Sequence, residues 1–244
     1  LGKEIKKAVI TVPAYFDDAS RGAVMLAARI VGFDVLRLIA EPTAAAYAYG
    51  FHKKSEGAYM IYDLGGGTFD VSILNMEAGV FQVIATGGDN LLGGDDLDHI
   101  LAERIAKELN ISLEPSLYLK AKELKELLSS QNSASLNFGS QKFEITREVF
   151  ENLISPLINR TIKIAKDTLF DADVKLDGII LVGGSTRIPF IAQNLTRSFG
   201  IEVFSDIDPD RAVVIGAALQ AENLSLVSSR NSLLIDVLPL SVGM

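Results

Sequence analysis

The sequence predicts an α/β fold built on mixed sheets. Short apolar, β-branched runs such as Ala8–Val12 alternate with longer segments whose apolar residues recur at helical spacing, which is typical of this class. Three strands at Tyr59–Leu64, Phe69–Leu74 and Val80–Ala85 are separated only by tight turns, which predicts a meander. With 244 residues, 48% of them hydrophobic, the chain is long enough to bury a sizeable core.

The first strands and helices are predicted from the residues at which they begin and end. The strand Ala8–Val12 ends at Pro13, and the helix that follows has an Asp/Ser-rich start at Asp17 and extends to about Val31. A strand at Val35–Ala40 leads into a short Ala-rich helix with Pro42 in its first turn and its end near Gly50. The meander comes next.

A helix-rich stretch from about residue 93 to 145 then interrupts the alternation and is a candidate inserted subdomain. It holds helices at Asp95–Leu109 and Leu117–Ser130 and two short strands at Ala134–Phe138 and Lys142–Ile145. Thr146 has the character of an N-cap for a long helix that reaches about Phe170. A strand at Gly178–Val182 and helices at Ile188–Phe199 and Asp210–Glu222 complete the order.

Composition excludes several classes of function. The net charge of −8 argues against nucleic acid or anionic lipid as the main partner. The chain has no cysteine, so it can form no disulfide, thiolate nucleophile or iron–sulfur ligand set. No apolar run is long enough to span a bilayer and nothing resembles a signal peptide, so a cytoplasmic location is expected. The two histidines, His52 and His99, lie in no motif and are expected to be surface or capping residues.

The strongest local signal is the segment Asp63–Asp70, with the sequence DLGGGTFD. Strands on both sides predict a hairpin turn, in which three glycines let the backbone take positive φ and approach a ligand. Successive amides in such a turn can bind an anion, Thr68 adds a hydroxyl, and Asp63 and Asp70 could hold water or Mg²⁺ beside a phosphate. Residues 61–110 carry nine acidic and two basic side chains, which suits an anion only with a cation. The alternative is a plain hairpin whose aspartates cap the turn.

A second signal is the segment Leu181–Pro189, with the sequence LVGGSTRIP, in which a strand passes through two glycines into a helix. It offers backbone amides and a helix N-terminus to an anion or nucleotide, with a hydroxyl from Ser185 and a guanidinium from Arg187 that can stack on a base. The segment is neither a G-x-G-x-x-G nor a Walker A loop. It could equally be a capped strand-to-helix turn.

The remaining candidate site residues also have ordinary structural explanations. Residues 86–89 and 92–96 are interpreted as turns, and Asp95 suits a helix N-cap. Glu41 precedes Pro42 at a helix start, where it either interacts with the helix dipole or orients a water bound to a metal. The charged residues between Lys120 and Glu126, Lys125 among them, would ordinarily form a solvated helix face.

Together these segments resemble the nucleotide-binding domain of the seventy-kilodalton heat-shock chaperones of the DnaK type. The motifs that carry the resemblance occur in the family's order over essentially the whole chain: VITVPAYF at 9–16, EPTAAA at 41–46, DLGGGTFD at 63–70, Gly88 with residues 92–95, LVGGSTR at 181–187 and DPDRAVVIGAA at 208–218. Within the family, VPAYFDDASR, ATGGDNLLGGDDLDH and DIDPDRAVVIGAALQAE look most like the HscA branch, the iron–sulfur biogenesis chaperones.

The resemblance implies an actin-like ATPase fold with a ribonuclease H-like motif, which grips ATP or ADP with Mg²⁺ between two lobes. It implies part of lobe I at 1–57, the lobe II core at 58–92 and 146–228, the inserted subdomain at 93–145, and the interdomain linker with the start of a substrate-binding domain at 229–244. The apolar run 233–238 matches the linker, although it could also be an ordinary edge strand.

Site residues follow from the resemblance. Gly65, Gly66, Gly67 and Thr68 would hold the β- and γ-phosphates, Asp63 and Asp70 would act near Mg²⁺ and the attacking water, and Glu41 would help to order that water. Gly183, Gly184, Ser185, Arg187 and Ile188 would surround adenosine, with Asp210 and Gly88 nearby and Lys125 and Ser129 on the helix that closes over it. Lys122 departs from the family, which usually has a glutamate there. Pro13 and Arg21 match a switch proline and a relay arginine.

The function expected from the resemblance is that of a chaperone ATPase that couples Mg-ATP hydrolysis to peptide binding and release, in iron–sulfur cluster assembly. A J-type co-chaperone, an iron–sulfur scaffold protein as client and a nucleotide-exchange factor are the expected partners. The family's first phosphate hairpin would precede Leu1 and its peptide-binding domain would follow Val242, so a cut piece with weak nucleotide binding and negligible hydrolysis is expected. The rival interpretations are an interaction module that does not hydrolyse ATP and another actin-like ATPase, such as a sugar kinase.

Overall fold

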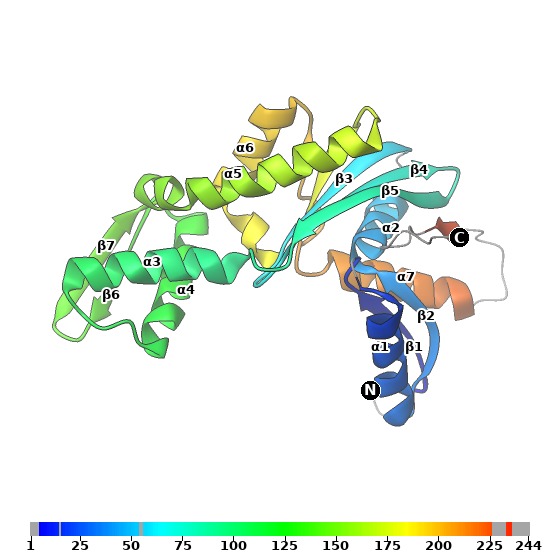
Figure 1. Cartoon of the computed structure of the whole chain (residues 1–244), viewed down its shortest axis with the longest axis horizontal. Helices are drawn as coiled ribbons and strands as arrows, with labels where there is room; N and C mark the ends of the chain where they lie inside the picture. The colour runs from blue at the N-terminus through cyan, green and yellow to red at the C-terminus, as the bar shows by residue number, and fades with distance from the viewer. Residues whose placement is uncertain (1–4, 15, 54–55, 226–232, 236–244) are drawn as a thin grey trace.

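The computed structural model of the chain describes residues 5–14, 16–53, 56–225 and 233–235 (Figure 1). Within these residues the largest sheet has six strands in the order β10-β5-β4-β3-β8-β9. They are β3 (Gly57–Leu64), β4 (Phe69–Glu77), β5 (Val80–Asp89), β8 (Gly178–Val182), β9 (Val203–Phe204) and β10 (Leu233–Ile235). The strands β3, β4 and β5 form the predicted antiparallel meander, while β8 is parallel to β3, so the sheet is mixed as predicted.

Each central strand supplies two cores, because alternate residues point to opposite faces of a sheet. Met60 and Tyr62 belong to the core that includes side chains of α5 (Arg147–Ala172) and α6 (Pro189–Phe199). Tyr59 and Ile61 belong to the core on the other face, with the alanines of α2 (Glu41–Lys53). Figure 1 shows α5 along one side of the sheet and α2 and α7 (Ala212–Ser225) on the other.

The predicted helix-rich stretch lies at one end of the molecule, drawn in green in Figure 1. It consists of α3 (Gly94–Leu109), α4 (Pro115–Ser130) and a separate two-stranded antiparallel sheet of β6 (Ser133–Phe138) and β7 (Gln141–Thr146). Thr146 caps α5 as predicted, because its Oγ1 accepts a hydrogen bond from the amide of Val149 at 3.3 Å.

The N-terminal elements lie at the other end, drawn in blue. β1 (Lys7–Val12) pairs in parallel with β2 (Asp34–Ala40), and α1 (Asp18–Ile30) connects them. Asp17 caps α1 by accepting a hydrogen bond from the amide of Ser20 at 2.8 Å. The helices α2 and α7 cross so closely that a Cβ at Gly216 would overlap the backbone of Ala44, so only glycine fits there.

Three predictions of local structure are wrong. Residues 86–89 do not form a turn but continue β5 to Asp89, where Gly88 pairs with Asp70 of β4. Asp95 is not the N-cap of α3, because the helix begins at Gly94 and the N-cap is Gly93. Instead, Asp96 closes this end, and its carboxylate accepts a hydrogen bond from the amide of Gly93 at 2.7 Å. The Ala-rich helix extends beyond Gly50, to Lys53.

The C-terminal apolar run is described only at residues 233–235, which form β10 along β5. This strand is the edge strand that the sequence allowed, and the rest of the expected linker lies outside the described residues. In the part of the chain that the structure describes, no helix combines the length and the apolar composition needed to cross a membrane.

Candidate functional site

The glycine-rich segment 63–70 forms the predicted hairpin turn between β3 and β4. Asp63 pairs with Asp70 across the two strands, and the amide of Gly65 donates to the carbonyl of Thr68 at 3.0 Å. The turn is held by α3, because the amides of Gly94 and Asp95 donate to the carbonyls of Gly65 and Gly66 at 2.9 and 2.7 Å. Among the described residues, the amides of Gly66 and Gly67 have no acceptor.

Of the two reasons predicted for the three glycines, positive φ and close approach to a ligand, the first is wrong. None of Gly65, Gly66 and Gly67 has a positive φ, so backbone conformation does not require glycine in this turn. Internal packing does not require it either: a Cβ at Gly65 or Gly66 would meet only ordinary contacts, the nearest at 3.6 and 3.8 Å, and one at Gly67 would meet nothing within 4 Å. The missing side chains therefore leave room beside the turn, which a ligand could use.

The second glycine segment packs directly against this turn. β8 ends at Val182, and residues Gly184–Arg187 form a short 3-10 turn before α6 begins with Pro189. Ser185 Oγ donates to the carbonyl of Gly65 at 2.9 Å, across 120 positions of sequence. Gly183 has φ +84°, and a Cβ on it would lie 2.6 Å from Oδ1 of Asp63. The two predicted motifs thus form one continuous structure.

One wall of the site comes from α4. Lys125 is buried, and its Nζ lies 2.9 and 3.0 Å from the two carboxylate oxygens of Asp98 on α3 and 3.0 Å from the carbonyl of Gly94. Burial raises the pKa of Asp98, and the hydrogen bond and charge of Lys125 lower it again. The expectation that Lys125 belongs to a solvated helix face is wrong, because the helix presents this face to α3.

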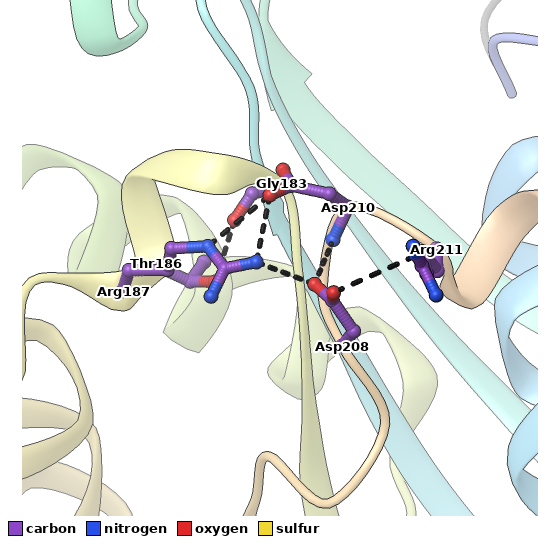
Figure 2. A network of polar contacts seen from close by, with 6 residues as sticks. All are labelled: Gly183, Thr186, Arg187, Asp208, Asp210 and Arg211. Carbon is purple, nitrogen blue, oxygen red and sulfur yellow. Dashed lines mark hydrogen bonds and ion pairs between the residues drawn. The ribbon is translucent and has the colours of Figure 1, made fainter.

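The opposite wall carries an ion-pair network, shown in Figure 2. Arg187 donates from Nε and Nη2 to Oδ2 of Asp210 at 3.1 and 2.8 Å, and its Nη2 lies 2.5 Å from Oδ1 of Asp208. Arg211 extends the network, with Nε 3.9 Å from Asp208. The hydrogen bond and charge of Asp210, with those of Asp208, raise the pKa of Arg187. The guanidinium is therefore held in place before any ligand arrives.

These walls enclose a cavity of about 540 Å³, within the range of small-molecule sites. Eight of its lining residues were predicted from the sequence: Gly66, Lys125, Ser129, Gly184, Ser185, Arg187, Ile188 and Asp210. Three others, Asp95, Lys122 and Glu126, were not assigned to the site. Helical spacing from Ser129 could have found Glu126 on α4. Lys122 was noted as a departure from the family and Asp95 as part of the glycine-rich segment 92–96, but neither was assigned a role in the site.

The predicted acidic residues form a second group behind the turn. Burial raises the pKa of Asp63 to about 7, and the charges of Asp70 and Glu41 add to the effect. Burial likewise raises the pKa of Asp70 to about 6, together with the charge of Glu41 and against a hydrogen bond from Thr68. Burial also raises the pKa of Glu41, at the first residue of α2. The charges of Asp70 and Glu41 therefore act on Asp63, and the charge of Glu41 acts on Asp70.

The other predicted residues lie outside the cavity lining. Gly88 allows β4 and β5 to approach, because a Cβ on it would lie 2.6 Å from the carbonyl of Phe69. Pro13 and Arg21 are joined through the turn before α1: the amide of Phe16 donates to the carbonyl of Pro13, and Nε of Arg21 donates to that of Phe16 at 2.9 Å. His99 is half-exposed on α3, with Nε2 3.1 Å from Glu103 Oε1. The side chain of His52 lies outside the described residues.

The fit of a nucleotide with Mg²⁺ can be tested on this geometry. The amides of Gly66 and Gly67 have no acceptor among the described residues, there is room beside both glycines, and the cavity is of sufficient size and lined mostly by polar and charged residues, all of which fit a phosphate-bearing ligand. Among the described residues, no three carboxylate or imidazole side chains are arranged to hold a metal ion directly. The residues therefore fit Mg²⁺ only as it usually binds, through water and phosphate oxygens, with Asp63 and Asp70 as the nearby carboxylates.

Known proteins match this chain along its whole length. The family described as "Hsp70 protein" matches residues 1–244. A relative named "Chaperone protein HscA homolog" from Rickettsia prowazekii (strain Madrid E) is 55% identical over all of this chain, and so is one of the same name from Rickettsia conorii (strain ATCC VR-613 / Malish 7). A third, from Rickettsia bellii (strain RML369-C), is 56% identical. The chain spans 40% of the length of these curated relatives. With the whole chain matched, it belongs to the Hsp70 family.

Proposed function

We propose that this chain is the nucleotide-binding, ATP-hydrolysing region of an HscA-like Hsp70 chaperone. The observation that carries the proposal is the cavity, which brings together Gly66 of the glycine turn, helix α4, the 3-10 turn after β8 and Asp210. These segments are far apart in the sequence, and each contains residues that the motifs had assigned to nucleotide. The names of the curated relatives support the same branch.

We assign each part of the nucleotide to the residues that surround the cavity. The amides of Gly66 and Gly67 bind phosphate oxygens, and Thr68 supports them by donating to Asp70. Ser185 keeps the turn in register with the adenosine end through its bond to Gly65. Arg187 and Ile188 then flank the base, and Asp210 keeps the guanidinium fixed in orientation. Lys125 and Ser129 close the cavity from α4.

The acidic group is proposed to manage water at the phosphate end. Burial raises the pKa of Asp63 and so makes its carboxylate a stronger base, which suits it to accept a proton from a water that attacks a phosphoryl group. Glu41 and Asp70 orient that water. Asp63 and Asp70 would hold Mg²⁺ through water, and the ion would supply positive charge to the phosphates and relieve the repulsion among the carboxylates.

We also propose a finer organisation of the chain. Residues 1–57 belong to lobe I, 58–92 and 146–228 to the core of lobe II, 93–145 to an inserted subdomain, and 229–244 to a linker and the start of a substrate-binding domain. The proposed activity couples ATP hydrolysis to peptide binding and release and serves iron–sulfur cluster assembly. The proposed partners are a J-type co-chaperone, an iron–sulfur scaffold protein as client and a nucleotide-exchange factor. Pro13 and Arg21 are proposed to relay the nucleotide state.

Calorimetric titration of the chain with Mg-ADP tests the site. Saturable binding that is weakened by Gly184→Val is expected, because the new side chain would enter the cavity and crowd Asp210, whose Oδ1 would lie 2.9 Å from a Cβ at this position. Gly22→Val, on the exposed surface of α1, is a matched control away from the cavity. No heat at millimolar Mg-ADP would contradict the nucleotide site and favour an interaction module instead.

A further inference from the structure

A second cavity lies at the end of the molecule that α3, α4, β6 and β7 form, and it shares no lining residue with the nucleotide cavity. Its volume is about 480 Å³, within the range of small-molecule sites. Three segments line it: the link from α3 to α4, the first two turns of α4, and the turn between β6 and β7. None of the family motifs contributes a residue, so the proposed function gives this cavity no role.

The cavity contains one basic side chain, Lys120, whose ammonium is held in place without a carboxylate. Its Nζ donates to the carbonyl of Asn137 at 2.6 Å and lies 4.5 Å from the centre of the Phe138 ring. In the part of the chain that the structure describes, no acidic side chain pairs with it. A carbonyl and a ring face attract a cation, but neither carries a full negative charge. The ammonium is therefore oriented while its charge stays available to a ligand.

The start of α4 adds a donor on the same side. Glu114 is the N-cap residue, but its side chain makes no capping hydrogen bond. The amide of Ser116 has no acceptor among the described residues, and Ser116 lies one turn before Lys120 on the same face of the helix. A carboxylate has several lone pairs, so one such group can accept hydrogen bonds from both the amide and the ammonium.

Apolar side chains form another part of the cavity. Leu117 is buried, Phe138 is partly exposed and Ile111 is exposed, and all three line the cavity. Leu113, between the lining residues Ser112 and Glu114, is also exposed. Apolar surface that continues from a cavity onto the outside of a protein is typical of a protein interaction site. The occupant is therefore expected to carry apolar groups beside its carboxylate and to extend beyond the cavity.

We propose that this cavity is a docking site for an acidic peptide segment of another protein, in which a carboxylate stands next to apolar side chains. The carboxylate pairs with Lys120 and accepts a hydrogen bond from the amide of Ser116. An apolar side chain of the segment packs against Leu117 and Phe138. The inference goes beyond the proposed function, because it uses neither the nucleotide cavity nor a nucleotide.

Amide NMR spectra of the 244-residue chain, titrated with blocked tripeptides, test the proposal. Leu-Asp-Leu is expected to move the signals of Ser112, Ser116 and Gly139. It is also expected to bind roughly two- to fivefold more tightly than Leu-Asn-Leu, the range for a partly exposed ion pair. Lys120→Gln removes this preference and Lys120→Arg keeps it. Glu114→Gln enlarges it, because the one acidic side chain among the described lining residues is neutralised.

The matched control is Lys163→Gln, which removes the same charge from the exposed surface of α5 away from this cavity and keeps the preference. Unmoved cavity signals, equal affinity for Leu-Asp-Leu and Leu-Asn-Leu, or a preference that survives Lys120→Gln would overturn the inference. Equally tight binding of Ser-Asp-Ser or of free isocaproate would overturn it too, because the apolar surface or the peptide would then contribute nothing. Thermal denaturation confirms that each variant is folded. Titration with Mg-ADP is independent of all these outcomes.

Discussion

Lys125 Nζ lies 2.9 Å from Oδ1 of Asp98, in a pair whose two side chains are only 10% and 7% exposed. The ammonium also bonds to the carbonyl of Gly94 at 3.0 Å, and the amide of Gly94 bonds to the glycine turn. A single buried cation therefore fixes α4 relative to α3 at the end of α3 that supports the turn.

Replacement of Lys125 by methionine is expected to reduce the free energy of unfolding by about 3–5 kcal/mol, because Asp98 would remain buried without its partner. Urea denaturation measures the loss. The double variant Asp98→Asn with Lys125→Met should recover part of it. Removal of the exposed Lys142–Glu144 pair by Lys142→Met should cost less than about 1 kcal/mol. Equal losses from Lys125→Met and Lys142→Met would contradict this account.

The raised pKa of Asp63 predicts a specific pH dependence. The folded chain holds the proton to about pH 7, whereas the unfolded chain releases it near its ordinary value of 3.8. Between these values the folded state binds more protons, so the contribution of Asp63 to the free energy of unfolding falls as pH rises from about 4 to about 7. Asp63→Asn should therefore raise the melting temperature at pH 8 by about 2 °C or more, and leave it nearly unchanged at pH 4.

Asp171→Asn, on the exposed surface of α5, is the control for the pH experiment. It removes the same carboxylate from a solvated position and should leave the pH profile of the melting temperature as it is. A profile for Asp63→Asn that runs parallel to that of the unmodified chain from pH 4 to 8 would show that Asp63 titrates normally.

Substitutions at two glycines with positive φ distinguish the free-energy cost of backbone strain from that of steric overlap. Gly139→Ala, with φ +62° and open space around it, should cost about 1 kcal/mol from strain alone. Gly183→Ala, with φ +84°, would add the collision of its Cβ with Asp63 and with the carbonyl of Leu64. Chemical denaturation should show a loss several times larger at Gly183, and a loss no larger than that at Gly139 would disprove the close approach of the two motifs.

Substitution of Gly67 is expected to affect ligand binding and not stability. It has no positive φ, and nothing lies within 4 Å of the place that an alanine methyl group would take, so Gly67→Ala should change the free energy of unfolding by less than about 0.5 kcal/mol. Affinity for Mg-ADP should nevertheless fall, because the methyl group occupies room beside the amide. Parallel denaturation and calorimetry check both parts. Unchanged affinity would remove Gly67 from the proposed phosphate site.

Local patterns predicted most of the fold. The helix start at Asp17, the cap at Thr146, the turn at Gly65–Thr68 and the alternation of strands and helices all appear as expected. The failures occur where long-range pairing decides the structure. Residues 86–89 contain two glycines and an aspartate and therefore resemble a turn, but pairing with β4 extends them as a strand. The two-residue strand β9 has no pattern of its own and exists because it pairs with β8.

In the site, too, local motifs could be predicted and long-range contacts could not. Gly66, Ser185 and Arg187 could be assigned because they stand in recognisable motifs, and the structure brings them to one cavity. Asp98 could not be assigned, because its importance comes from a lysine 27 positions away on another helix. The burial of Lys125 was missed for the same reason: helical spacing indicates which residues share a face but not which neighbour covers that face.

The fixed carbonyls of the glycine turn have one more consequence. In a trans peptide the N–H points opposite to the preceding C=O. The carbonyls of Gly65 and Gly66 are bonded to the first amides of α3, so the N–H groups of Gly66 and Gly67 are forced to point away from that helix. Neither peptide unit can flip to offer an oxygen without breaking its bond to α3. The turn is thereby restricted to donors, and it would reject a bare cation while accepting an anion, with no charged side chain of its own.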